Sequence, residues 1–206
     1  MRRPTIGIVC LAVLAASLYI SGFLLLPSTA AAQGKFVVKP VAEKELERLP
    51  AGPLYWRLEN FPTLPQAEAA AGPTSLAGEV SGKAWLFTLG QKGGATPGGS
   101  KVAEIGPVPP ITAPEYLLRI NHAGGPPGAK TAVHSHPGSE AFYVLAGCLG
   151  QKTSKGVHYA KAGEAMNGYG PGTAMEVFSA GTSDLDQLVM FLVDATKPFS
   201  EPAKFE

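Results

Sequence analysis

Short apolar segments separated by glycine and proline run through most of the chain. Leu54–Leu58, Trp85–Thr88 and Tyr116–Asn121 are rich in aromatic and apolar side chains, a composition that predicts β-strands. The run LVMFLV at Leu188–Val193 has no polar residue, so it predicts a strand that is buried on both faces. We expect the faces of this strand to be covered either by the N-terminal part of the chain or by another subunit.

Helical and irregular segments are expected between these strands. Leu64–Ala71 consists of good helix formers and is followed by Gly72-Pro73, which predicts a helix that ends there. Val41–Leu49 is rich in charged residues and predicts a short solvated helical turn. Gly90–Gly99 predicts a flexible surface loop, and the proline-rich Ile105–Pro114 predicts an extended segment without a regular hydrogen-bond ladder.

Residues 128–147, GAKTAVHSHPGSEAFYVLAG, hold the main candidate chemistry. His134 and His136 are two residues apart, so on a strand their imidazoles project from the same face. Glu140 follows after a short turn and opens an alternating stretch. Two imidazoles and a carboxylate that meet are a ligand set typical of non-haem iron(II) and other first-row divalent metals.

The spacing of Gly128, His134, His136, Glu140 and Gly147 resembles the first motif of the cupin superfamily at every fixed gap. The resemblance implies an all-β fold, a single antiparallel barrel of jelly-roll type. It also implies a metal ion inside the barrel, held by the two histidines and the glutamate with a fourth ligand from a second motif.

The expected domain organisation follows from this resemblance. Residues 113–200 would form the barrel, residues 33–112 an N-terminal extension packed on it and containing the short helix, and residues 201–206 a C-terminal tail. No internal repeat is visible, and the length fits one globular domain.

The second motif should lie within Ala162–Val177, where only its opening glycine, Gly163, matches. The turn Gly170-Pro171-Gly172 is displaced, and Met175 takes the place of the histidine. Met175 is therefore either a thioether ligand, which suits copper(I) or weak axial coordination to iron, or an apolar residue lining the pocket.

Other side chains complete the predicted site. Phe142 and Tyr169 are expected to line the pocket together with Met175. His122 is an outside candidate for a fourth ligand, because its strand precedes the two histidines, but His122 and His158 are each interpreted as surface or satisfied polar residues. The expected cofactor is a divalent ion of iron, manganese, copper, nickel or zinc.

The N-terminus has the pattern of a secretory signal peptide. Arg2 and Arg3 precede an uncharged run from Ile6 to Leu26, and small residues of the form Ala-x-Ala end at Ala32. Residues 1–32 are thus expected to be removed and the protein exported, to the periplasm or the extracellular space. The alternative is an uncleaved helical anchor, because the apolar run is long enough to span a bilayer.

Charge and cysteine content narrow the expected partners. The formal net charge is +1, with 17 basic and 16 acidic residues and no basic run, which argues against a nucleic-acid partner. After removal of the signal peptide Cys148 is the one remaining cysteine, interpreted as a small apolar residue at a strand turn, with a free thiol or an intermolecular bridge as alternatives.

Two classes of function remain. The first is an exported metalloenzyme, a dioxygenase-like oxidoreductase or an isomerase, that acts on a small molecule in the pocket. The second is a non-catalytic barrel in which the same centre binds a small ligand. A homodimer is also expected, because apolar strands on the outside of a small barrel often become a subunit interface.

Overall fold

The computed structural model describes residues 34–206, and the predicted signal peptide at residues 1–32 lies outside them. Within the described residues the regular secondary structure consists of antiparallel β-strands and one short helix, which confirms the predicted all-β class. None of the helices in this part of the chain is long and apolar enough to cross a membrane.

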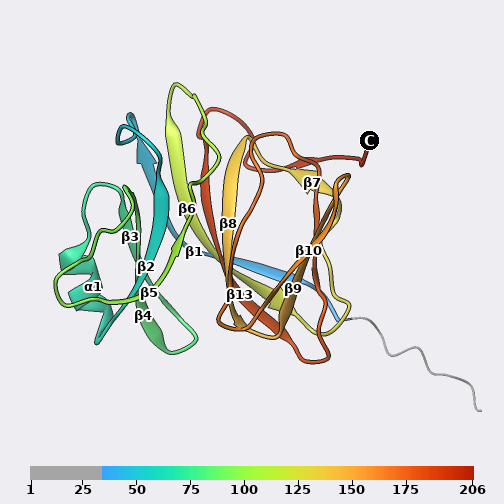
Figure 1. The fold of residues 1–206 in the computed structure, drawn as a ribbon, viewed down its shortest axis with the longest axis horizontal. Helices are drawn as coiled ribbons and strands as arrows, with labels where there is room; N and C mark the ends of the chain where they lie inside the picture. Colours follow the sequence, from blue (N-terminus) through green and yellow to red (C-terminus); the bar gives the residue numbers. More distant parts are fainter. Residues whose placement is uncertain (1–33) are drawn as a thin grey trace, which may run out of the picture. The chain divides into compact units, whose positions relative to one another are not determined.

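The middle layer of the structure is a five-stranded antiparallel sheet (Figure 1). In spatial order its strands are β1 (Val37–Leu46), β6 (Tyr116–Gly125), β13 (Leu185–Asp194), β8 (Gly138–Ala146) and β11 (Ala165–Asn167).

A smaller sheet faces one side of this middle layer and closes the barrel (Figure 1). Its strands are β10 (Gly156–Lys161), β9 (Cys148–Thr153) and β12 (Glu176–Ser179). The short strands β7 (His134–Ser135) and β14 (Glu201–Pro202) pair with each other, and His134 is bridged to Met175 just before β12.

A four-stranded sheet covers the other side of the middle layer (Figure 1). Its spatial order is β3 (Ser75–Val80), β4 (Lys83–Gly90), β2 (Tyr55–Phe61) and β5 (Ser100–Ile105). Helix α1 (Leu64–Ala70) packs against this sheet through Ala67, as the helix-forming residues predict. The hydroxyl of Thr63 caps its N-terminus by accepting a hydrogen bond from the Gln66 backbone N–H.

Two hydrophobic cores lie on opposite faces of the middle sheet. Leu188, Met190 and Leu192 of β13 pack with side chains of β2 and β4, whereas Val189 and Phe191 pack with side chains of β9 and β12. This division follows from the alternation of side chains along a strand. The predicted two-sided burial of this run is confirmed, and since one chain covers both faces, the run needs no second subunit.

The predicted helical turn at Val41–Leu49 is wrong. Most of this segment belongs to β1, which pairs with β6 along its whole length as an edge of the barrel sheet. Glu43 forms an ion pair with Arg119 of β6 at 2.8 Å, and Lys44 donates to the backbone carbonyls of Gly72, before β3, and of Ser75, in β3. Pairing and packing with distant strands thus override the local helix preference of the charged residues.

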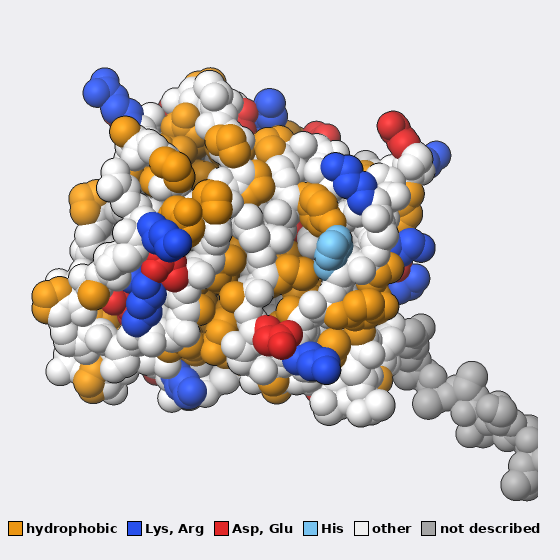
Figure 2. Space-filling view, in the orientation of Figure 1, with side chains coloured by type: hydrophobic (Ala, Val, Ile, Leu, Met, Phe, Trp, Pro, Cys, Tyr) orange, Lys and Arg blue, Asp and Glu red, His pale blue; other side chains and the backbone are white. Residues whose placement is uncertain are grey.

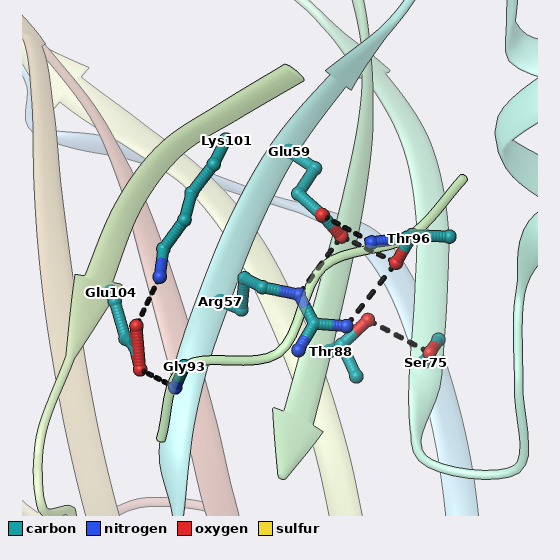
Figure 3. A network of polar contacts seen from close by, with 8 residues as sticks. All are labelled: Arg57, Glu59, Ser75, Thr88, Gly93, Thr96, Lys101 and Glu104. Carbon is teal, nitrogen blue, oxygen red and sulfur yellow. Dashed lines mark hydrogen bonds and ion pairs between the residues drawn. The ribbon is translucent and has the colours of Figure 1, made fainter. Parts of the chain in front are cut away.

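A buried polar network fixes the Gly90–Gly99 loop onto the four-stranded sheet (Figure 3). The Glu59 carboxylate accepts hydrogen bonds from the Thr96 backbone N–H and hydroxyl, and it pairs with Arg57 at 3.0 Å. Burial alone would raise the pKa of Glu59, but the bonds from Thr96 and Arg57 outweigh it and lower the pKa. The loop predicted from its glycines is therefore anchored at its centre.

Charge is balanced locally on the surface shown in Figure 2. Lys and Arg side chains stand singly or beside Asp and Glu, and hydrophobic side chains occupy much of the area between them.

Candidate functional site

A cavity of about 330 Å³ lies inside the barrel, between the middle sheet and the three-stranded sheet. Its walls are mainly apolar, formed by side chains such as Phe142, Val177, Val189 and Phe191. The volume falls in the range of small-molecule sites.

His134 and His136 line this cavity together, and the structure fixes the orientation of both rings. Their ring centroids are 5.0 Å apart. The Nδ1 atom of His134 lies 2.8 Å from the carbonyl oxygen of Ala132, and the Nδ1 atom of His136 lies 2.7 Å from that of Phe199. A carbonyl accepts, so each Nδ1 carries the proton and each Nε2 carries the lone pair that a metal binds.

Glu140 lies on β8 with its side chain in the barrel interior, and only 2% of the residue is exposed. Its Oε2 atom is 4.0 Å from Nε2 of His136, and its Oε1 atom accepts a hydrogen bond from Gln151. The predicted approach of the carboxylate to the histidines is therefore present for His136.

Burial keeps this pair uncharged near neutral pH. Desolvation raises the pKa of Glu140 to about 8, and the hydrogen bond from Gln151 offsets this only in part. Desolvation also lowers the pKa of His136 to about 4, although the bond to the Phe199 carbonyl opposes it. A buried carboxyl without a cationic partner is costly to ionise, and a bound cation would remove that cost.

Met175 lies in the same interior layer. Its backbone exchanges hydrogen bonds of 2.8 and 2.9 Å with that of His134, so the two residues are directly opposite each other. The side chain is buried, and its Sδ is 3.4 Å from the Gln151 amide nitrogen that also binds Glu140. The structure therefore brings Met175 to the predicted site, beneath the cavity surface.

The structure does not bring the remaining candidates to the site. His122 lies on the opposite face of β6 and pairs with Asp186 on the outside of the barrel. Tyr169 is not among the cavity-lining residues, and its ring contacts that of the exposed His158 at 6.2 Å. The chain has left β11 before Tyr169, so strand alternation no longer directs this side chain inward.

Two glutamines complete the interior and were missed from the sequence. Gln151 on β9 connects Glu140 and Met175 through one amide nitrogen. Gln187 on β13 lines the cavity and is 0% exposed, and within the described part of the chain neither its amide nitrogen nor its amide oxygen has a hydrogen-bond partner. The sequence signal for Gln187 was its spacing relative to the predicted strand: it lies two residues before Val189, so both side chains project from the face that lines the barrel interior.

The donor types fit a divalent metal ion, although they do not form a closed site. Two atoms that each lie about 2.1 Å from one ion are at most about 4.2 Å apart, and His136 and Glu140 satisfy this limit at 4.0 Å. Across residues 34–206, no trio of His, Cys, Asp or Glu side chains is arranged closely enough to hold a metal ion. Binding would require Glu140 to turn from Gln151 toward the imidazoles.

Comparisons with known proteins were made at the levels of sequence and structure. No family profile and no curated protein sequence matches the chain. Solved structures match it only in part. A cupin-like protein from Thermotoga maritima has 19% identity and a TM-score of 0.38, covering 43% of this chain and 65% of that one.

Two enzymes of solved structure match a similar part of the chain. A DMSP lyase, DddQ, from Ruegeria pomeroyi has 17% identity and a TM-score of 0.37, covering 42% of this chain and 43% of that one. Salicylate 1,2-dioxygenase from Pseudoaminobacter salicylatoxidans has 16% identity and a TM-score of 0.33, covering 36% of this chain and 20% of that one. The chain thus spans less than two thirds of the length of each of these three proteins.

The strand order of the chain itself supports the fold assignment. The five-stranded and three-stranded sheets are antiparallel, and the first-motif residues face the space between them. The chain has a cupin-type jelly-roll fold, extended by a four-stranded sheet.

Proposed function

We propose that the protein is a metal-dependent enzyme of dioxygenase-like type that acts on a small molecule inside the barrel. The observation that carries the proposal is the pair of histidines whose Nδ1 atoms are both bonded to backbone carbonyls, beside a buried carboxyl that pairs with no Arg or Lys among the described residues. Backbone bonds of this kind hold metal-binding histidines in one tautomer and orientation.

The residues of the site would each have a separate task. His134, His136 and Glu140 would bind the metal, and Met175 would lie next to it, beneath the cavity surface. Gln151 would hold the Glu140 carboxyl until the metal binds, and the apolar walls would exclude water from the reacting groups. A divalent ion bound there supplies Lewis-acid polarisation or adjacent open positions for dioxygen and a substrate.

A binding barrel without turnover is the second candidate. It is favoured by Met175 at the position of the second-motif histidine and by the hydrogen bond that turns Glu140 toward Gln151. Both features weaken a metal centre and leave the cavity itself unchanged.

Oxygen uptake after metal removal and reloading separates these candidates. The protein is chelated, reloaded with iron(II), manganese or copper, and mixed with phenolic and diketone-like compounds in an oxygen electrode. A dioxygenase consumes oxygen only after reloading. If the chelated protein binds the same compounds and no metal form takes up oxygen, the proposal of an enzyme is wrong and the binding barrel is supported.

We also propose that the protein acts after export, on the basis of the signal-peptide pattern at residues 1–32. The expected mature form begins at Gln33. Intact-mass measurement of protein isolated from the producing cells should show the loss of these residues. A full-length mass in the membrane fraction would support the anchored form instead.

A further inference from the structure

The cavity has a second polar end, remote from the histidines. Gln187 is paired with Val144 of β8, whereas Glu140 on the same strand is paired with Phe191. Since Gln187 and Phe191 are four residues apart on β13, the two polar ends are separated by about 13 Å along the strand at roughly 3.3 Å per residue. Phe142 and Val189 form the apolar wall between them.

Gln187 is unusual because it is buried and both polar atoms of its amide lack partners among residues 34–206. Leaving one buried polar group without a hydrogen bond costs on the order of 1–3 kcal/mol, so most buried groups are paired. A glutamine amide presents a donor and an acceptor side by side. Its complement is a group that offers an acceptor and a donor with the same spacing.

The surroundings of Gln187 exclude a charged partner. Among the described residues, the cavity wall contains no Lys, Arg or Asp. Its titratable side chains lie at the other end of the cavity and are those of His134, His136 and Glu140. Asn121 adds a second amide to the wall, two residues along β6 from Ala123, the pairing partner of Gln187, and its oxygen already accepts from Arg119 at 2.9 Å. An ionised ligand group next to Gln187 would be desolvated without a counter-charge.

We infer that the cavity binds an elongated, largely apolar and uncharged molecule whose carboxamide or lactam group pairs with the side-chain amide of Gln187. The rest of the molecule extends along Phe142 and Val189 toward the histidines. This inference deepens the proposed function, on which it rests only for the far end of the ligand, because the pairing with Gln187 needs no metal.

The test compares two probes of the same shape in two proteins. The probes are 3-phenylpropanamide and 4-phenylbutan-2-one, in which a methyl group replaces the amide NH2 and removes the donor. Their affinities are measured by calorimetry on the chelated full chain, for wild type and for Gln187→Met. Each probe loses its hydration equally in both proteins, so the change in the ratio of the two Kd values reports on Gln187 alone.

The preference for the amide over the ketone is expected to fall at least tenfold in Gln187→Met, which equals about 1.4 kcal/mol. Gln91→Met, on an exposed loop outside the cavity, should keep the wild-type ratio. A ratio that stays within twofold in Gln187→Met, or a wild-type protein that does not bind the amide, would overturn the inference.

Two further measurements keep the result unambiguous. The melting temperature of ligand-free Gln187→Met should equal or exceed that of wild type, because an unbranched apolar side chain replaces two unpaired polar atoms. If this variant does not fold, a crystal structure of wild type with 3-phenylpropanamide decides, and an amide located away from Gln187 contradicts the inference. Metal content, measured separately, tests the proposed function and leaves this result unaffected.

Discussion

Replacing Glu140 by Gln is expected to stabilise the metal-free protein by an amount that grows as the pH rises from 4.5 to 8. An unfolded glutamate ionises near its ordinary pKa of 4.5, whereas folded Glu140 keeps its proton up to about pH 8. In this window the unfolded state binds fewer protons, so wild type loses stability with rising pH. The gap between the two pKa values corresponds to about 5 kcal/mol at 1.36 kcal/mol per unit.

The measurement is urea unfolding of both proteins in EDTA at several pH values. His136 acts with the opposite sign, since its lowered pKa removes stability as the pH falls from 6.5 toward 4. This contribution is shared by wild type and Glu140→Gln and largely cancels in their difference. Glu68→Gln, an exposed change on α1, should follow wild type at every pH. Parallel curves for wild type and Glu140→Gln would show that Glu140 titrates normally.

Replacing His136 by Ala should weaken metal affinity at least tenfold, about 1.4 kcal/mol or more. His136 is the histidine whose Nε2 lies nearest the carboxylate, and its Nδ1 bond to Phe199 aligns it for coordination. Calorimetric titration of chelated protein with manganese or zinc measures the change, and elemental analysis of purified protein provides a second readout. His158→Ala on β10 is the matched control, because its side chain lies outside the cavity.

Metal binding to wild type should also be pH-dependent. A metal-bound Glu140 has lost the proton that it otherwise keeps up to about pH 8, so metal affinity should fall about tenfold for each pH unit below 8.

For the His136→Ala variant, a metal content equal to that of wild type would remove the assignment of the site.

Much of the barrel was predictable because its signals are local. The spacing of His134, His136 and Glu140 placed all three side chains in the barrel interior, and the apolar run of β13 predicted a strand with two buried faces. The apolar run alone could not show whether one of its two faces is covered by another subunit or by the same chain. The four-stranded sheet covers that face, and this sheet depends on contacts between distant segments.

The errors in the prediction also have physical causes. The charged residues near Glu43 favour a helix locally, but strand pairing with β6 decides their conformation. Tyr169 follows the end of a strand, where alternation no longer applies. His122 lies on the outer face of β6 and pairs with Asp186, in agreement with its interpretation as a surface or satisfied polar residue. Gln187 was overlooked because glutamine is usually exposed, so its burial became visible only with the register of β13.

Anomalous diffraction from a crystal of the metal-loaded protein, collected at the absorption edge of the bound metal, tests the central claim most directly. The account predicts one peak within about 2.3 Å of the Nε2 atoms of His134 and His136 and of a Glu140 oxygen. A peak elsewhere, or loaded protein with Glu140 still bonded to Gln151 and no metal between the imidazoles, would contradict it.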